Sequence, residues 1–297
     1  LTSINIPDSV TRIGYSAFKN CGCLTSISIP PSVTTIEDWT FLGCHSLRNI
    51  NIPDTVTRIG HSAFEDCASL TSINIPPSLT TIEDGIFLCC HSLRNINIPD
   101  TVTSIEDYAF SECNSLKNIN IPNGVTRIGD RTFFNCNSLK NINIPNGVTR
   151  IGDSAFFNCN SLISITIPSS VIAIGMNPFC GCHANLKNES KAFIYEHNIL
   201  FNRDKTVIIS YRAKEANYVI PDSVTGIGDG AFSGCDSLTS INIPDSVTSI
   251  GWWAFSGCDS LTSINIPDSV TTIGNRAFSG CKSLKSINIP NSVTSIG

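Results

Sequence analysis

Apolar side chains recur along this chain at intervals of 23 residues, and their spacing within one interval predicts its local structure. Position 1 of each repeat is its opening leucine. Ile4 and Ile6 flank the polar Asn5, which is the period-two alternation of a strand with one buried face. We therefore expect a strand over positions 1–6 of every repeat. The apolar or small residues of the first repeat are Leu1, Ile4, Ile6, Val10, Ile13, Ala17, Phe18 and Cys21.

The rest of the repeat contains a second extended stretch and a turn. Pro7 cannot donate a hydrogen bond to a β-ladder and ends the first strand. Val10 and Ile13 indicate the second stretch, Gly14 permits a bend, and the apolar spacing over 17–21 is that of one helical turn. Aspartate at position 15 is expected to cap this helical turn. These aspartates are Asp38, Asp84, Asp107, Asp130, Asp153 and Asp229.

The repeats divide the chain into three segments. Residues 1–185 contain eight units, residues 186–214 are irregular, and residues 215–297 contain three units and part of another. One unit cannot bury its apolar side chains alone, so stacking at about 4.8 Å is expected to produce one continuous solenoid domain. The irregular segment is predicted to hold two strands, 193–201 and 207–211, around a turn at 202–206, before 218–220 re-enters the repeat.

The repeat unit resembles a known family. Its pattern is Cys-x-x-Leu-x-x-Ile-x-Ile-Pro-x-x-Val-x-x-Ile-Gly-x-x-Ala-Phe. It is similar to the BspA-type leucine-rich repeat over 1–185 and 215–297, and the irregular segment resembles a recurrent insertion of that family. The resemblance implies a leucine-rich repeat solenoid with a parallel β-sheet on one face. It also implies a secreted or cell-surface protein of bacteria or mucosal protists, linked to adhesion and host-protein binding, with no catalytic residues to transfer.

Composition narrows the class of partner. The chain has 297 residues with a formal net charge of −5, whereas nucleic-acid binding needs a surplus of Lys and Arg on one face. No nucleophile elbow, phosphate loop, His-Glu-x-x-His motif or calcium loop occurs in it. The sequence therefore predicts a non-enzymatic protein with no cofactor, whose partner is a protein or a glycan rather than nucleic acid.

Fourteen cysteines raise the question of disulfides and metals. Eleven stand at position 21 and are expected to form a row of buried thiols, because an odd row of equivalent neighbours cannot pair fully. Cys180, Cys182 and His183 lack a second pair of ligands at zinc spacing. Stacked acids such as Glu83 and Asp84 could hold Ca²⁺, but a capping function explains the aspartates without an ion. We expect no metal site.

The candidate binding residues are those that interrupt the repeat at positions expected to face water. Aromatic and arginine side chains dominate binding hot spots, although loop positions also vary when they pack against nothing. We expect the aromatic residues to anchor a partner and the cationic residues to steer it. The aromatic candidates are Tyr15, Trp39, Tyr108, Trp252 and Trp253, and the cationic candidates are Arg48, Arg94, Lys117 and Lys140.

Two features leave alternatives open. Asparagines at position 5 lie on the outer face of the predicted strands, where they could form amide ladders or a polar platform for a glycan or an extended peptide. At the ends, Leu1 begins in phase and Gly297 stops at position 14. This favours a fragment of a longer solenoid, and the alternative is end-to-end self-association of a structural subunit or spacer through uncapped termini.

Overall fold

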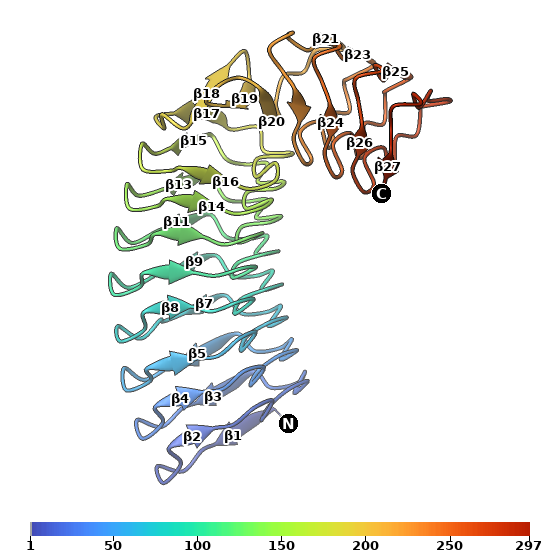
Figure 1. Cartoon of the computed structure of the whole chain (residues 1–297). Coiled ribbons are helices and arrows are strands. Elements are labelled where there is room, and N and C mark those ends of the chain that lie inside the picture. The colour runs from blue at the N-terminus through green and yellow to red at the C-terminus, as the bar shows by residue number, and fades with distance from the viewer. Residues whose placement is uncertain (1) are drawn as a thin grey trace. The chain divides into compact units, whose positions relative to one another are not determined.

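Each 23-residue repeat forms one coil of a β-solenoid in the computed structural model, which describes residues 2–297 (Figure 1). Leu1, predicted to open the leucine row, lies outside the described residues. The chain divides into a first unit, Leu1–Glu189, and a second unit, Ser190–Gly297. The prediction of one continuous domain across the insertion stays a prediction.

The first strand of each repeat lies where the alternating pattern predicts it. In the first unit these strands form parallel sheets in the orders β1-β3-β5-β7, β9-β11-β13 and β15-β17. Ile27 pairs with Ile50, a shift of one repeat, and both side chains face the core. The strands are β1 (Ser3–Asn5), β3 (Ser26–Ser28), β5 (Asn49–Asn51), β7 (Ser72–Ile73), β9 (Asn95–Ile96), β11 (Asn118–Asn120), β13 (Asn141–Asn143), β15 (Ser164–Ile167) and β17 (Asn185–Asn188).

The second strand of each repeat covers positions 12–13. These short strands pair in parallel in the orders β2-β4-β6 and β8-β10-β12-β14-β16. Their isoleucines point inward, as at Ile59 and Ile128, while the preceding residue is half-buried or exposed. The strands are β2 (Arg12–Ile13), β4 (Thr35–Ile36), β6 (Arg58–Ile59), β8 (Thr81–Ile82), β10 (Ser104–Ile105), β12 (Arg127–Ile128), β14 (Arg150–Ile151) and β16 (Ala173–Ile174).

The helical turn predicted at positions 17–21 is wrong, since residues 2–297 contain no helix. Positions 16 and 20 have positive φ, as at Tyr108 (59°) and Glu112 (62°), and this left-handed backbone interrupts a right-handed helix. The N–H groups of Tyr108, Phe110 and Glu112 donate to carbonyls of the next repeat at 2.7–2.9 Å. Those of Ser111 and Cys113 donate three residues back. The segment is therefore a chain of β-turns that also hydrogen-bonds to its neighbour.

The predicted cap at position 15 also acts differently. Asp107 Oδ1 accepts a hydrogen bond of 2.8 Å from the backbone N–H of Asp130, its counterpart one repeat later. Asp130 does the same for Asp153 at 2.9 Å. The aspartates therefore join successive repeats rather than capping a helix of their own repeat.

Close packing of the repeats accounts for the glycine at position 14 in several repeats, as at Gly152. A Cβ on Gly152 would lie 2.5 Å from the carbonyl carbon of Gly129 and 2.6 Å from the backbone nitrogen of Asp130. Neither approach leaves room for a methyl group, and φ of Gly152 is not in the left-handed region. At Gly152 the cause is therefore contact between backbones rather than the predicted bend. The position does not require glycine in every repeat, because Glu37, Glu83 and Glu106 also occupy it and a Cβ on Gly14 would meet no atom within 4 Å.

A column of phenylalanines fills the core of the first unit. Phe110 is fully buried, and its ring stacks on Phe87 at 5.6 Å and on Phe133 at 5.7 Å between centroids. Burying such a side chain contributes about 1.5–3 kcal/mol to folding. Leucine at position 1, isoleucine at 4, 6 and 13 and valine at 10 surround the column. Stacking of equivalent repeats therefore aligns the position-18 rings in one continuous column.

The position-21 cysteines are free thiols, as predicted. Cys113 Sγ donates to the carbonyl oxygen of Phe87 at 3.2 Å, and Cys136 Sγ donates to that of Phe110 at 3.1 Å. The inner members are buried, whereas Cys21, Cys235 and Cys281 are half-buried. Burial raises the pKa of the Cys44 thiol to about 11.

The second unit begins with an antiparallel sheet of three strands, β18 (Phe193–Glu196), β19 (Ile199–Asn202) and β20 (Val207–Tyr211). The single strand predicted over 193–201 is wrong, because His197 and Asn198 both have positive φ and form a two-residue hairpin loop. The predicted turn at 202–206 is confirmed by Asn202 Oδ1, which accepts hydrogen bonds from the backbone nitrogens of Thr206 and Val207.

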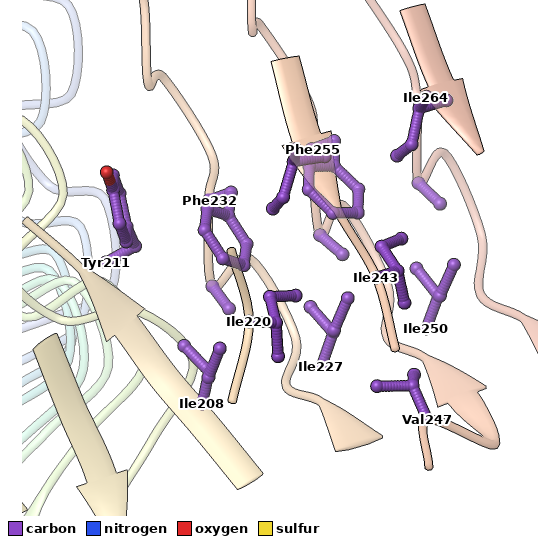
Figure 2. Close-up of a cluster of buried hydrophobic side chains, with 14 of the residues drawn as sticks. Ile208, Tyr211, Ile220, Ile227, Phe232, Ile243, Val247, Ile250, Phe255 and Ile264 are labelled. Carbon is purple, nitrogen blue, oxygen red and sulfur yellow. The ribbon is translucent and has the colours of Figure 1, made fainter. Parts of the chain in front are cut away.

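After this sheet the 23-residue repeat resumes. Tyr218 pairs with Ile241, one repeat later, which confirms the predicted re-entry at 218–220. Tyr211 takes the place of a column phenylalanine and lies 4.9 Å from the Phe232 ring, with Phe255 next in the row (Figure 2). The remaining strands are β21 (Asn217–Val219), β22 (Gly226–Ile227), β23 (Ser240–Asn242), β24 (Ser249–Ile250), β25 (Ser263–Asn265), β26 (Thr272–Ile273) and β27 (Ser295–Ile296).

The irregular segment also begins later than predicted. Residues 185–188 form β17, which pairs with β15 through Leu186 and Ile165. The offset is two residues short of a full repeat, so the 23-residue period does not reveal this strand.

Candidate binding surfaces

Three large aromatic side chains stand on left-handed backbone at position 16. Trp39, Tyr108 and Trp253 have φ of 57°, 59° and 49°, whereas Gly85 and Gly230 occupy the same position in other repeats. A left-handed bulky residue is unusual and costs about 1–3 kcal/mol. Position 16 therefore carries aromatic residues at a conformational cost that glycine would avoid.

Hydrogen bonds to the next repeat hold this backbone in place. The N–H groups of Trp39, Tyr108 and Trp253 donate to the position-15 carbonyl of the following repeat at 2.9, 2.8 and 2.9 Å. Gly85 makes the same bond at 2.9 Å. The conformation is thus set by the solenoid, and the side chain is directed away from the core.

The predicted aromatic anchors lie at the surface. Tyr15, Trp39, Tyr108 and Trp252 are 58%, 44%, 37% and 51% exposed. Trp253 is half-buried and meets Trp252 edge to face, with ring centroids 6.2 Å apart. Tyr15 and Trp39 stand on adjacent repeats, Tyr108 lies three repeats beyond Trp39, and the two tryptophans belong to the second unit.

Tyr108 belongs to a cluster that the sequence analysis identified only in part. Arg131, one repeat later at position 16, places its guanidinium 5.5 Å from the Tyr108 ring centroid and donates to the Tyr108 hydroxyl at 3.2 Å. It also lies 5.8 Å from the Phe134 ring, which stacks on Phe157 at 4.7 Å. The available signal was phenylalanine at position 19 in two consecutive repeats. The arginine thus lies against two aromatic rings at the surface of the turn.

The predicted cations form a separate row at position 2. Arg94, Lys117 and Lys140 stand on consecutive repeats, joined by backbone hydrogen bonds from Lys117 to Arg94 at 3.2 Å and from Lys140 to Lys117 at 2.9 Å. Arg48 lies two repeats before Arg94, with Thr71 between them. All four cations are exposed. We call Arg94, Lys117 and Lys140 the cation row.

The cation row and the exposed aromatic residues of position 16 do not form one site. Lys117 immediately precedes β11 in the first-strand sheet, whereas Tyr108 follows β10 in the second-strand sheet. The aromatic candidates and the cationic candidates therefore belong to two separate surfaces.

A groove of about 450 Å³ lies over the outer face of β9, β11 and β13. Asn141 Nδ2 donates to Asn118 Oδ1 at 3.2 Å, so this amide–amide bond stands at position 3 rather than in the predicted position-5 row. The lining consists of Asn95, Ile96, Asn118, Ile119, Asn120, Asn141, Ile142, Asn143 and Ser164. We call it the asparagine groove.

Three of the four arginines at position 12 pair with carboxylates. The buried Glu37 accepts hydrogen bonds of 2.8 Å from Arg12 and from Arg58, and Arg58 also contacts Asp38 at 3.1 Å. Arg127 donates to Asp107 at 2.9 Å. These arginines therefore have structural partners.

The carboxylates of Asp84, Glu106 and Asp107 approach within 4.8 Å of one another. Asp84 accepts from the backbone N–H of Asp107, and Arg127 contacts both Asp107 and Glu106, the latter at 3.6 Å. Nearby, burial raises the pKa of Glu83. Hydrogen bonds and Arg127 account for this acidic cluster without an ion.

In the second unit, Trp252 borders a groove of about 550 Å³ over the second-strand face. Glycines 228, 251 and 274 lie in its lining, beside the polar side chains of Asp229, Ser249 and Asn275. A Cβ on Gly274 would approach Trp252 Cδ1 to 2.5 Å, so the indole rests directly on this glycine.

Comparison with known proteins agrees with the repeat architecture. A family model described as BspA type leucine rich repeat region matches residues 1–117, 103–193 and 211–297. No curated protein sequence matches the chain. Within residues 2–297, no helix could cross a membrane.

Solved structures of bacterial leucine-rich repeat proteins are similar over almost the whole chain. A leucine rich cell surface protein from Faecalibacterium prausnitzii is 33% identical with a TM-score of 0.78, covering 98% of this chain and 81% of that one. A leucine-rich repeat protein from Bacteroides ovatus is 34% identical with a TM-score of 0.56, covering 98% and 79%. The pneumococcal vaccine antigen PcpA, at 21% identity and a TM-score of 0.57 over 95% and 68%, shares the fold.

Proposed function

Because the chain belongs to the BspA-type leucine-rich repeat family, we propose that it is a non-enzymatic recognition protein, secreted or at the cell surface, that binds a protein or glycan. The F. prausnitzii relative is a cell surface protein, which supports this location. The solenoid presents side chains on a backbone fixed by repeat-to-repeat hydrogen bonds. Such preorganisation lowers the entropy cost of association.

The observation that carries the proposal is the placement of aromatic residues at position 16. Trp39 and Tyr108 are exposed on left-handed backbone, where a glycine such as Gly85 of another repeat is less strained. Exposed tryptophan and tyrosine contribute little to the core, whereas they are the residues most enriched in binding hot spots. Arg131 stacked on Tyr108 adds the third residue type of such hot spots.

The test uses the chain against arrays of extracellular matrix proteins and of glycans. The variant carries Trp39→Ser, Tyr108→Ser and Trp253→Ser, because serine already stands at position 16 as Ser62 and Ser154. For a partner that contacts both Trp39 and Tyr108, loss of these two hot-spot contacts should weaken affinity by about a hundredfold or more. The melting temperature should stay the same or rise.

Two results would count against the proposal. In the first, the triple variant binds every array component as the wild-type chain does. In the second, neither protein binds and the chain sediments as assemblies that grow with concentration, which would favour the structural subunit. Tyr108→Phe serves as the matched control, because it keeps the ring that Arg131 covers.

A further inference from the structure

The asparagine groove lies beside a row of cations without carboxylate partners. Each of Arg94, Lys117 and Lys140 immediately precedes a groove-lining residue, namely Asn95, Asn118 or Asn141. Adjacent β-strands are about 4.8 Å apart, so the three cations follow one another at short intervals at the starts of β9, β11 and β13. None of the three cations lines the groove itself, and the cation row borders the strands β9, β11 and β13 that carry it.

The charge on this surface is opposite in sign to that of the whole protein. The chain has a formal net charge of −5, yet positions 1–6 of the three repeats that begin at residues 93, 116 and 139 contain no aspartate or glutamate. Within the described chain, no carboxylate forms an ion pair with Arg94, Lys117 or Lys140. The row is therefore a group of exposed positive charges that form no ion pair among residues 2–297.

The position-12 arginines provide an internal comparison. Arg12 and Arg58 share the buried Glu37, and Arg127 pairs with Asp107, whereas Arg150 forms no ion pair among residues 2–297. Three of the four position-12 arginines thus have acidic partners, and none of the cation row does within the same residues. At position 2 the chain alternatively uses threonine, as at Thr25 and Thr71, with the same backbone hydrogen bonds. The fold therefore does not require charge at position 2.

We propose that the asparagine groove and the cation row bind an anionic glycan, a linear polysaccharide carrying sulfate or carboxylate groups. Amide groups and the Ser164 hydroxyl are suitable hydrogen-bond partners for sugar hydroxyls, and the cations are suitable partners for the acidic groups. The evenly spaced charges match a polymer with evenly repeated anions. The groove lining provides no deep apolar pocket, which an acidic peptide would need for its side chains. This proposal rests on the recognition function above and names its ligand class.

The experiment measures binding of the full chain to dextran sulfate, to unmodified dextran and to poly-glutamate at several salt concentrations. The variant is Arg94→Thr, Lys117→Thr and Lys140→Thr, which installs a residue native to this position. Wild-type chain should bind dextran sulfate but not dextran, and added salt should weaken binding because it screens exposed charges. Losing three exposed ion pairs should weaken binding by about tenfold.

A charge-matched control carries Lys191→Thr, Arg203→Thr and Lys214→Thr, three exposed cations of the second unit. It lowers the net charge equally and should bind dextran sulfate as the wild-type chain does. The proposal would be overturned if both variants lost affinity for dextran sulfate equally, or if the cation-row variant lost none. Binding of poly-glutamate as tight as that of dextran sulfate would identify an acidic peptide surface instead.

A second variant tests the amides directly. Asn95→Ser, Asn118→Ser and Asn141→Ser keep the charge and use the residue present at this position as Ser26, Ser72 and Ser164. The preference for dextran sulfate over poly-glutamate should fall, and an unchanged preference would contradict glycan recognition by the amides. The position-16 aromatic variant should retain dextran sulfate binding, so failure here and failure of the general recognition function are separable.

Discussion

At the scale of single residues, the position-21 thiol joins each repeat to the one before it. Cys136 Sγ donates to the Phe110 carbonyl, which also accepts the backbone N–H of Cys113. The thiol is thus a small buried donor in contact with the aromatic column. Burial raises the pKa of Cys90, Cys113 and Cys136 because ionisation would place a charge in the core.

The thiol row makes stability sensitive to alkaline pH. The pKa of Cys44 is raised from 9.0 to about 11, so the folded state keeps a proton that the unfolded state loses. This contribution is complete below pH 9 and is lost as pH rises through 11. We expect the melting temperature to fall over this interval. The triple variant Cys90→Ser, Cys113→Ser and Cys136→Ser keeps a donor that does not ionise, and its melting temperature should fall less steeply.

The exposed Cys23 provides the control. Cys23→Ser should leave the pH dependence of the melting temperature as it is in the wild-type chain. Equal slopes for the wild type and the buried triple variant between pH 9 and 11 would show that the thiol row does not govern alkaline stability.

At the scale of elements, the two strands of the repeat were predictable, whereas the turns at positions 16–21 were not. Alternation around Asn5 and the proline after each first strand are local signals, and both strands of the repeat lie where those signals place them. The left-handed backbone of Tyr108 depends on a hydrogen bond to Asp130, 22 residues away, and a short local pattern does not contain it. For the same reason, the contacts of Arg131 with Tyr108 and Phe134 could not be predicted from the sequence.

The phenylalanine column should dominate the stability of the repeats. Phe110 is fully buried between two rings, so Phe110→Ala should leave a cavity and cost about 3–5 kcal/mol. Phe134→Ala removes a half-buried ring of the surface turn and should cost clearly less. Chemical denaturation monitored by circular dichroism measures both. A similar loss for the two variants would mean that the column is no more important than the surface turn.

At the scale of the whole molecule, the first unit grows by adding equivalent layers. Ile119 pairs with Ile96 on one side and with Ile142 on the other, in the same register each time. Each regular repeat therefore makes the same contacts with the repeat before it: strand pairing, a hydrogen bond from the position-21 thiol, and stacking of the phenylalanine ring.

Removal of whole layers should therefore shorten the first unit without unfolding it. Deleting residues 70–138 joins Ser69 to Leu139 in phase and removes three repeats. The long axis of this unit should shorten by about 14 Å at about 4.8 Å per layer, with cooperative unfolding retained. Small-angle X-ray scattering provides the measurement. A deletion of 70–127, which is out of phase, is the control and should disrupt the fold.

The hydrogen bonds from position 16 to the following repeat have a consequence for how such genes change. Because the regular junctions use the same backbone atoms, recombination between two regular copies of the repeat should yield a protein whose layers still fit together. The number of 23-residue repeats can then change while each repeat keeps its own surface residues. Surface residues can therefore diversify one module at a time on an unchanged fold.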